Sequence, residues 1–489
     1  MFNAHREQNE ALAFLRKESL DVFNRIHSIA QDILFVNQVH AAYPDIPILP
    51  NLRCGAWYTD PAIATDCPAY FKSTDGHFSN WSFNLRRPNL HLLPLVAAND
   101  GAGMVIVDST RAGKRLPDAL SKTVPIWCAV VNRAILRRFP SKNAASAGLG
   151  NEWDTALYTP PGAVSAQEHA QIAARIDKWA DALAASSYSL PDLPHPLRPM
   201  WLTPASGALP VPPPGYIPVI CVSASRVAAD GAQRREGGFA YIQGSGDDHE
   251  LWGEGLTPTL FWRHRQTLLE ADRAELPGMV ARLVAHDADA VVRLQDSSKR
   301  APTPITRVRS RILVGAVSDL PGNWQQDTAY IVVTGLATRD VVIPTGSLAV
   351  LQIEAWAGKK GQFQFLQDIL PRAIDFARAQ LKAGRRVCAA CDTGTDFSVG
   401  VALAAMQLFF DDEGELCETD ATNTNLNKDS IRTRLEWIIA SHPAANPSRT
   451  TLKRVNEYLL SARELRARPA RPFPSQNSAN PPSTSQSPT

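Results

Sequence analysis

Two polar stretches in the first quarter of the chain combine residue types that together could hold a polyphosphate. The first, 72–87, mixes hydroxyls, amides, a histidine and bases. The second begins where an apolar run at 104–107 breaks into Asp108, hydroxyl residues, a glycine and several bases. Hydroxyls and backbone N–H groups bind phosphate oxygens, Lys and Arg neutralise them, and an aspartate can hold Mg²⁺. A polar loop after a buried strand is the simpler interpretation, but the two neighbouring blocks together favour a phosphate site.

A third polar stretch, 244–250, places Asp247 and Asp248 side by side and follows them with His249. Adjacent carboxylates repel each other unless they share a cation or a base, so a metal ion is a sensible occupant. A solvated turn built from Gly and Asp explains the same residues. On the residues alone, both interpretations stay open.

A fourth feature is an apolar run that ends in Cys391 and passes through a glycine-containing loop into a helix beginning at Ser398. Such a loop directs backbone N–H groups at one point, and the helix N-terminus adds a field that favours an anion. The spacing resembles the cysteine phosphatases of the dual-specificity type, which read His-Cys-x-x-Gly-x-x-Arg-Ser/Thr. Cys391, Gly394 and Ser398 match this pattern. Ala390 replaces the histidine, and Phe397 replaces the arginine.

The missing arginine argues against phosphatase chemistry. Phosphoryl transfer through a thiolate needs an activated thiolate and an arginine that stabilises charge on the equatorial oxygens. Asp392 and Asp396 add negative charge to the same loop. We therefore expect the loop to serve substrate binding or structure rather than hydrolysis.

Further bases could contact a ligand. His77 lies near Asp75 in a polar loop, where it could act as a general base or contact phosphate. Arg86 and Arg87 are neighbours in sequence, so at most one of them need face a given ligand. Basic residues that could contact nucleic acid, or simply form a solvated face, are Arg133, Arg137 and Arg138, the run from Lys299 to Arg311, and Arg449, Lys453 and Arg454.

Composition bounds the class of protein. A chain of 489 residues is too long for one core, and its 44% hydrophobic and 20% charged residues are ordinary for a globular protein. With a net charge of +2, a nucleic-acid ligand has to be met by a local patch. The cysteines are scattered and lack paired metal spacing, which predicts a reducing compartment. Without a signal peptide or a long apolar run, a cytoplasmic protein with no membrane partner is expected.

Periodicity predicts the elements that must position these residues. In the first part of the chain, we expect helices within 6–40 and at 114–122, 165–185 and 259–286, and strands at 104–107, 126–131 and 217–223. The proline-rich segment 186–218 has the composition of an ordered crossing segment or a linker.

Strands and helices alternate from 311 onward, which predicts an α/β domain with a mostly parallel sheet. The expected strands are 312–315, 330–333, 348–352 and 386–390, and the expected helices are 363–383, 398–411, 430–440 and 449–464. The chain is therefore assigned to the α/β class, with an α+β domain at 1–310 and the alternating domain at 311–465. The tail 466–489 is rich in Ser, Pro, Asn and Gln, and it is predicted to be disordered.

These blocks together resemble the initiator-tRNA 2′-O-ribosyl phosphate transferases of fungi and plants. The segments that carry the resemblance are 71–77, 80–87, 107–111, 113–127, 241–244, 246–250 and 391–394, with Asp396 and Ser398. They cover most of the chain except the tail. The C-terminal domain of that family is itself similar to the dual-specificity phosphatases and lacks the arginine, so Phe397 fits the family.

The resemblance implies a pentosyltransferase, that is, a glycosyltransferase that modifies tRNA. Such an enzyme takes phosphoribose from phosphoribosyl pyrophosphate and attaches it to the 2′-hydroxyl of the purine nucleotide at position 64, in the T stem of initiator methionine tRNA. The added anion keeps this tRNA away from elongation, and Mg²⁺ is the expected cofactor. Two alternatives remain open, a phosphatase-like phosphoester hydrolase and a non-catalytic tRNA-binding protein.

The same resemblance assigns roles to residues as hypotheses. Asp108, with Asp247 or Asp248, is expected to hold Mg²⁺, and Asp75 or His77 to orient or deprotonate the hydroxyl. The residues expected to hold phosphate or pyrophosphate are Lys72, Ser109, Thr110, Arg111 and Lys114. Further candidates for substrate binding are Ser73, Thr74, Arg86, Arg87, His249, Cys391, Asp392, Gly394, Asp396 and Ser398.

Overall fold

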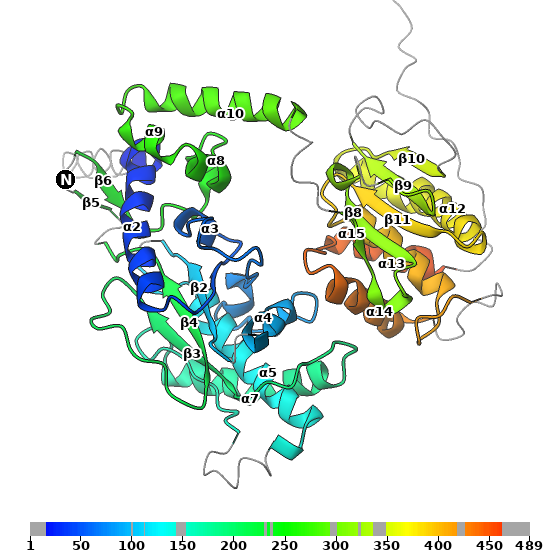
Figure 1. Cartoon of the computed structure of the whole chain (residues 1–489), viewed down its shortest axis with the longest axis horizontal. Coiled ribbons are helices and arrows are strands. Elements are labelled where there is room, and N and C mark those ends of the chain that lie inside the picture. Colours follow the sequence, from blue (N-terminus) through cyan, green and yellow to red (C-terminus); the bar gives the residue numbers. More distant parts are fainter. Residues whose placement is uncertain are drawn as a thin grey trace, which may run out of the picture. The chain divides into compact units, whose positions relative to one another are not determined.

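The chain forms two compact units, Met1–Leu294 and Gln295–Thr489, here called the N-terminal and the C-terminal unit (Figure 1). The computed structural model describes residues 16–98, 101–111, 113–142, 153–228, 232–234, 238–293, 301–320, 324–335, 349–417 and 426–461. Within these ranges, the helices all lack the combination of length and apolarity that crossing a bilayer requires.

A parallel sheet forms the centre of the N-terminal unit, with the strand order β1-β2-β4-β3 and every neighbouring pair parallel. Its strands are β1 (Ile48–Pro50), β2 (Met104–Asp108), β3 (Leu197–Leu202) and β4 (Ile217–Ser223). Every position of β2 and β4 is buried, as expected for parallel strands covered on both faces. The predicted α/β class is confirmed. The sequence favoured an α+β N-terminal domain, but every neighbouring pair of strands in this sheet is parallel.

Helices cover both faces of this sheet (Figure 1). Helix α2 (Val22–Ala42) buries Ile26, Ile29 and Ile33 at helical spacing, and Asp21 caps it by accepting a hydrogen bond from the Asn24 N–H. It shares one core with residues from α3 (Gly55–Tyr58), α8 (Pro258–Arg263), α9 (Arg265–Glu270) and α10 (Leu276–Arg293). Helix α5 (Val124–Arg138) packs on β3 and is covered in turn by α7 (Ala166–Ala184).

Shorter elements complete the described part of the N-terminal unit. These are the 3₁₀ turns η1 (Ser73–Gly76), η2 (Leu90–Leu92) and η5 (His249–Leu251), helix α4 (Leu93–Ala98), the π-helical turn η3 (Ala119–Thr123), and the antiparallel strands β5 (Ala232–Arg234) and β6 (Ala240–Ile242).

Several predictions for the N-terminal unit are wrong in detail. Residues 126–131 belong to helix α5 rather than to a strand, because α5 is buried on nearly every side and its apolar run carries no clear period. The predicted helix 114–122 is a loop that leads into the π-helical turn η3. The predicted helix 259–286 is divided into α8, α9 and α10, and the proline-rich segment 186–218 contains strand β3.

The C-terminal unit holds a five-stranded sheet in the order β10-β9-β11-β8-β7. All its pairs are parallel except β7 with β8. The strands are β7 (Thr303–Pro304), β8 (Ile312–Ala316), β9 (Thr328–Thr334), β10 (Val350–Glu354) and β11 (Arg386–Cys391). The mostly parallel sheet predicted here is confirmed. The structure divides the chain after Leu294 rather than after residue 310, because β7 pairs with β8 and so belongs to this unit.

Helices α12 (Leu370–Lys382) and α13 (Phe397–Phe409) pack on this sheet, and α14 (Lys428–Ser441) and α15 (Arg449–Leu460) pack on α13. The remaining elements are η6 (Thr306–Val308), η7 (Val317–Asp319), α11 (Gly358–Gln364) and the π-helical turn η8 (Phe365–Ile369). Helix α13 is apolar almost throughout and nearly all its residues are buried. The predicted tail 466–489 lies outside the described residues.

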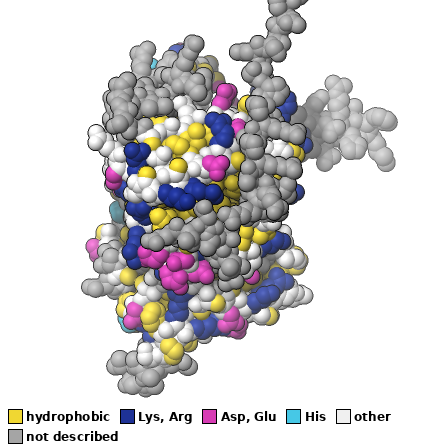
Figure 2. Space-filling view, turned by 90° about the vertical axis from the view of Figure 1, so that its right-hand side faces the viewer, with side chains coloured by type: hydrophobic (Ala, Val, Ile, Leu, Met, Phe, Trp, Pro, Cys, Tyr) yellow, Lys and Arg dark blue, Asp and Glu magenta, His cyan; other side chains and the backbone are white. Residues whose placement is uncertain are grey.

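Charge is mixed on the face of the molecule that Figure 2 presents. Figure 2 shows lysine and arginine side chains interspersed with aspartate, glutamate and apolar side chains on the face that it presents. A site for an anionic ligand therefore has to be identified from individual clusters of side chains.

Candidate active site

The carboxyl ends of β1, β2 and β4 lie at one edge of the N-terminal sheet, because neighbouring parallel strands point the same way. We call this the carboxyl edge. The segments that leave it are 51–54 after β1, 108–111 after β2 and 223–226 after β4. Backbone and side-chain hydrogen bonds join them to the loop 243–248. Crevices at such edges are the usual ligand sites of open α/β sheets.

Asp108 is fully buried at this edge, and its oxygens are occupied by protein donors. One oxygen accepts a hydrogen bond from Asn51 Nδ2 at 2.8 Å. The other accepts from Cys54 Sγ at 2.8 Å and from the Ser109 N–H at 2.9 Å. Burial raises the pKa of Asp108, and the charge of Arg53 and these hydrogen bonds oppose that rise without cancelling it. The geometry makes Asp108 a support for the loops and disfavours the predicted role as a Mg²⁺ ligand.

Arg53 is the central cation of the carboxyl edge. Its Nη2 lies 2.6 Å from Asp247 Oδ2 and donates to the Ser109 carbonyl at 3.3 Å. Its Nη1 donates to Ser73 Oγ at 3.1 Å. Burial works to lower the pKa of Arg53, but interactions with Cys54, Asp108 and Asp247 outweigh it, so the pKa is raised and the guanidinium stays charged.

Sequence reasoning missed Arg53 because it follows a strand of only three residues, inside an irregular stretch rich in proline and aromatics. The signal that could have found it is the pair formed by Asn51 and Arg53 directly after the short apolar run Ile48–Pro50. This is the same pattern that drew attention to the residues after 104–107.

Arg111 and the aspartate pair complete the cluster. Arg111 Nε lies 3.2 Å from Asp247 Oδ2, and its Nη1 lies 2.6 Å from Asp248 Oδ2. The Asp247 side chain is only 7% exposed, whereas that of Arg111 is 69% exposed. Burial raises the pKa of Asp247; Arg53 and Arg111 oppose this rise, and Asp248 adds to it. The predicted turn 244–250 therefore holds arginines rather than being merely a solvated loop.

Glycine is required at position 244, where the loop 243–248 meets the segment after β2. The Gly244 φ is +70°, and a Cβ there would lie 2.5 Å from the Thr110 carbonyl oxygen. Gln243 Nε2 also donates to the Lys114 carbonyl at 2.7 Å. Thr110 itself is 5% exposed. It thus serves loop packing in this structure rather than presenting its hydroxyl to solvent.

A buried polar chain lies beneath the cluster. Ser109 Oγ and Ser225 Oγ are 2.6 Å apart, and Ser225 Oγ donates to Asp32 Oδ2 at 2.6 Å. Tyr241 OH donates to the other oxygen of Asp32 at 2.7 Å, and the Gly244 N–H donates to Ser225 Oγ at 3.2 Å. Burial raises the pKa of Asp32 to about 7, although the hydrogen bonds from Ser225 and Tyr241 oppose the rise. Because Asp32 lies on helix α2, this helix thereby positions the segment 223–226 and the loop 243–248.

A second charged cluster is centred on Asp118, at the start of η3. Lys114 Nζ and Lys122 Nζ each lie 3.0 Å from its carboxylate, and His77 Nε2 lies 3.7 Å away. Burial works to raise the pKa of Asp118, but hydrogen bonds and charges from Lys114 and Lys122 outweigh it, so the pKa is lowered. Lys122 also contacts Glu168 at 3.1 Å.

The loop 72–87 contributes mostly internal contacts. Asp75 Oδ2 lies 3.1 Å from Arg87 Nη2, and Ser82 Oγ donates to Asp75 Oδ1 at 3.3 Å. The Lys72 ammonium lies 5.3 Å from the centre of the Tyr70 ring. Thr74 is exposed, and Arg86 is half-buried. Asp75 is therefore held by an ion pair, whereas His77 is half-exposed.

The structure places seven of the predicted N-terminal site residues in two clusters. Around Arg53 and Asp247 lie Ser73, Ser109, Arg111 and Asp248, and around Asp118 lie His77 and Lys114. His249 instead packs its ring 5.5 Å from that of Trp57 and lies 4.0 Å from Glu250.

The Cys391 loop lies in the C-terminal unit. Cys391 ends β11, and its Sγ is 3.1 Å from Ser398 Oγ. Gly394 has φ +70°, and a Cβ there would lie 2.6 Å from the Ala316 nitrogen. The acids of the loop are used within the fold: Asp392 accepts from the Gly335 N–H at 3.0 Å, and Asp396 accepts from the Ser448 N–H at 2.9 Å.

Phe397 occupies the position where phosphatases carry arginine, and its ring stacks on Phe365 with centroids 4.6 Å apart and an interplanar angle of 9°. The phenyl group offers no donor to a phosphate oxygen. The role that arginine has in phosphoryl transfer is therefore unfilled by this side chain, and the absence of hydrolysis stays a prediction.

The basic residues proposed for nucleic acid are largely paired. Arg133 and Arg137 contact Asp177 at 2.9 and 2.8 Å, and Arg138 donates to backbone carbonyls that include Ser186 at 2.7 Å. Arg454 lies 2.6 Å from Glu457. Lys299 and Arg300 lie outside the described residues. Surface ion pairs of this kind are weak and can exchange for phosphate, so a nucleic-acid role for these residues stays a prediction.

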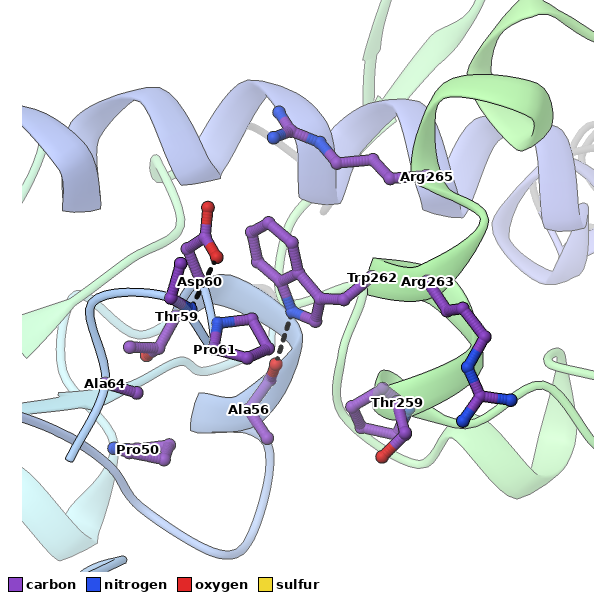
Figure 3. A pocket seen from close by; sticks show the side chains of 12 residues that line it. Pro50, Ala56, Thr59, Asp60, Pro61, Ala64, Thr259, Trp262, Arg263 and Arg265 are labelled. Carbon is purple, nitrogen blue, oxygen red and sulfur yellow. Dashed lines mark hydrogen bonds between the residues drawn. The ribbon is translucent and has the colours of Figure 1, made fainter. Parts of the chain in front are cut away.

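A pocket of about 690 Å³ lies beside α3 and α8, and its walls are mostly apolar (Figure 3). The Trp262 side chain forms part of its wall and donates from Nε1 to the Ala56 carbonyl at 2.8 Å. Arg263 also lines it and is paired with Asp287 at 2.6 Å. The residues predicted from sequence as site residues lie elsewhere, so we do not assign the chemistry to this pocket.

Metal-binding groups are sparse in the part of the chain that the structure describes. Among these residues, clusters of three or more His, Cys, Asp or Glu side chains suited to a metal ion are absent. Mg²⁺ commonly binds one or two carboxylates and takes its other ligands from water and substrate phosphates. Asp247 and Asp248 fit that mode, whereas the enclosed Asp108 does not.

Comparisons with known proteins cover both units. A family described as the Rit1 N-terminal domain matches residues 15–285, and one described as the Rit1 DUSP-like domain matches residues 349–459. The chain is 33% identical over 465 residues to an uncharacterised protein of Schizosaccharomyces pombe, a match that covers 90% of this chain and 95% of that protein. It is 32% identical over 496 residues to the tRNA A64-2′-O-ribosylphosphate transferase of Saccharomyces cerevisiae, covering 91% and 93% of the two chains.

Among solved structures, human DUSP28 is similar at 14% identity, with 33% of this chain and 96% of that chain covered and a TM-score of 0.24. A human tyrosine phosphatase-like serine/threonine/tyrosine-interacting protein is similar at 12% identity, with 31% and 92% covered and a TM-score of 0.24.

Proposed function

Because this chain belongs to the Rit1 family, we propose that it transfers a phosphoribosyl group to the ribose 2′-hydroxyl of nucleotide 64 of a tRNA. The chain is a glycosyltransferase of the pentosyl type, as its sequence predicted. We propose phosphoribosyl pyrophosphate as the donor and the T stem of initiator methionine tRNA as the acceptor. The added phosphate would keep that tRNA from taking part in elongation.

The observation that carries this proposal is the cluster of Arg53, Arg111, Asp247 and Asp248 at the carboxyl edge. Pyrophosphate is a concentrated negative charge, and arginine binds phosphate oxygens through paired donors of fixed geometry. In the cluster as it stands, each arginine is neutralised by a carboxylate. An incoming diphosphate can replace these carboxylates as the partner of Arg53 and Arg111, so the site is prepared for exchange of anions.

The reaction breaks the bond between C1 of the donor ribose and the pyrophosphate oxygen. It forms a bond between C1 and the acceptor 2′-oxygen, and the hydroxyl proton passes to a base. Positive charge develops on the donor ribose while negative charge develops on the leaving pyrophosphate. Arg53 and Arg111 can stabilise that leaving group, because groups fixed where charge develops cost little reorganisation during the reaction. Hydrogen bonds to Ser73 Oγ and the Ser109 carbonyl, together with the nearby charge of Asp108, fix Arg53 in this way.

Mg²⁺, when bound with the donor, would neutralise phosphate charge and favour departure of pyrophosphate. Asp247 and Asp248 are the residues that we propose would hold it. Their carboxylates would then turn from the arginines to the metal, which leaves Arg53 and Arg111 for the phosphates. Asp108 would act indirectly, by fixing Asn51, Cys54 and the Ser109 backbone.

For the acceptor proton, we propose His77 in preference to Asp75. Asp75 forms an ion pair with Arg87 inside the loop. His77 is 50% exposed, and its Nε2 lies 3.7 Å from the carboxylate of Asp118, which can orient the ring.

Purified protein incubated with Mg²⁺, initiator tRNA and donor labelled in its 5-phosphate tests the proposal. Label should appear on initiator tRNA and be lost when position 64 carries a 2′-deoxyribose. Binding of tRNA without transfer of label would favour the non-catalytic tRNA-binding alternative. Release of inorganic phosphate from a phosphoester that stops on Cys391→Ser would favour the hydrolase.

A further inference from the structure

Phe78 is an exposed aromatic side chain on the loop that borders the candidate active site. It is 68% exposed. The residue before it, His77, contacts the Asp118 cluster, and Ser73 of the same loop contacts Arg53. A single exposed apolar side chain is ordinary on a protein surface, so its exposure alone carries no function. The residues that support this ring and the charged side chains near them do indicate a function.

The Phe78 ring rests on a rigid support. It meets Trp81 edge to face, with centroids 5.4 Å apart and an interplanar angle of 78°. Trp81 is 4% exposed, and its Nε1 donates to Glu168 Oε1 at 3.0 Å. Ser79, between them, has φ +64°, a left-handed conformation that non-glycine residues seldom adopt. The chain thus accepts a strained residue in the turn that presents this ring.

Cationic side chains lie close to residues that contact or neighbour Phe78. The Arg175 guanidinium lies 4.9 Å from the centre of the Trp81 ring, and Arg175 is exposed. The Lys114 side chain is 56% exposed, whereas that of its partner Asp118, which His77 also approaches, is only 12% exposed. The surface therefore presents its positive groups outward and keeps the acid inward.

An aromatic face flanked by cations is the arrangement with which proteins bind RNA strands. The ring packs on a base or a ribose, and the cations meet the phosphates on either side. We propose that Phe78, with Arg175 and Lys114, forms the docking surface for the acceptor RNA strand, next to the reacting 2′-hydroxyl. This inference rests on the proposed function, because it assigns the acceptor to the same edge that binds the donor.

The test measures the affinity for fluorescently labelled initiator tRNA in the absence of donor. Phe78→Ala should weaken binding about tenfold, since stacking on one aromatic ring is worth roughly that much or more. Phe78→Trp should restore most of it. The matched control is Phe363→Ala, which removes an exposed phenylalanine, 51% exposed, from the C-terminal unit, and it should leave the dissociation constant unchanged.

Salt dependence separates the ring from the cations. Phe78→Ala should keep the wild-type slope of affinity against salt, because no charge is removed, whereas Arg175→Ala should reduce that slope by about one. An unchanged dissociation constant for Phe78→Ala would overturn the inference and leave a protein partner as the occupant of this surface. Thermal unfolding of each variant checks that the loop is intact.

Failure of the proposed transferase activity would be seen in the transfer of label rather than in the affinity for tRNA. Wild-type protein that binds tRNA but transfers no label would refute the transferase activity. The comparison of Phe78→Ala with Phe363→Ala would still decide whether RNA docks on this surface.

Discussion

Both units carry a parallel or mostly parallel sheet in which an inner strand, β2 or β11, ends in a polar, glycine-containing loop, yet the two loops present different chemistry. At the carboxyl edge of the N-terminal unit, Arg53 and Arg111 face carboxylates that a phosphate ligand can replace. At the Cys391 loop of the C-terminal unit, Phe397 stacks on Phe365 where an arginine would be needed. The comparison teaches that a strand–loop junction alone does not make a phosphate site. The cations that the surrounding chain supplies decide its chemistry.

The largest expected effect follows from removing the central cation of the N-terminal edge. Arg53→Ala should lower kcat/KM for phosphoribosyl transfer about a hundredfold or more, because it removes a fixed charge that stabilises the leaving group. Arg372→Ala is the matched control, since that arginine is paired with Asp368 in the C-terminal unit and its loss should be silent. Transfer by Arg53→Ala within a few-fold of this control would place the chemistry elsewhere.

A smaller effect is expected from disturbing the contact between the segment 108–111 and the loop 243–248. Gly244→Ala should destabilise the N-terminal unit, because its φ of +70° is strained for alanine and the Cβ would meet the Thr110 carbonyl oxygen at 2.5 Å. Gly113→Ala is the matched control: its φ is +82°, but nothing lies within 4 Å of the added Cβ. It should show only the backbone strain of roughly 1–2 kcal/mol. Equal losses in chemical denaturation would mean that close packing of the loops is unimportant.

Asp32 gives a pH-dependent test of the buried polar chain beneath the cluster. Its pKa rises from 3.8 to about 7 in the fold, so ionisation is harder in the folded than in the unfolded state. The resulting penalty is absent below pH 3.8, grows as pH rises towards 7, and is complete above 7. Asp32→Asn removes this penalty. Relative to wild type, the variant should therefore gain in free energy of unfolding between pH 5 and pH 8. A constant difference over that range would show that Asp32 ionises normally.

The smallest effect is expected at the Cys391 loop. Cys391→Ser should leave phosphoribosyl transfer within about twofold of wild type, since the polar contacts of the thiol within the described part of the chain are to Ser398 and Thr393. The assay is the same transfer of label to tRNA. A loss comparable to that of Arg53→Ala would erase the contrast between the two units and give this loop a direct part in the reaction.

Sequence reasoning found much of the site because its residues follow recognisable apolar runs. Asp108, Ser109 and Arg111 stand directly after β2, and Asp247 and Asp248 are adjacent in sequence, so type and position alone drew attention to them. The alternation of strands and helices after residue 311 likewise predicted the parallel sheet of the C-terminal unit.

What the sequence could not show depends on tertiary packing. Helix α5 is buried on nearly every side, so its apolar segment 126–131 has the sequence pattern of a buried strand. Arg53 follows a strand too short to recognise, and only the fold brings it to Asp247. The predicted roles of Asp108 and Thr110 also needed the fold, because their burial distinguishes support for the loops from contact with a ligand.

Donor affinity tests the central claim most directly. Calorimetric titration of phosphoribosyl pyrophosphate with Mg²⁺ into wild type, Arg53→Ala and Cys391→Ser compares the two edges without requiring tRNA. The account predicts that wild type and Cys391→Ser bind the donor alike, whereas Arg53→Ala loses at least tenfold in affinity, as expected when a charged phosphate contact is removed. Wild-type affinity in Arg53→Ala together with lost affinity in Cys391→Ser would contradict it.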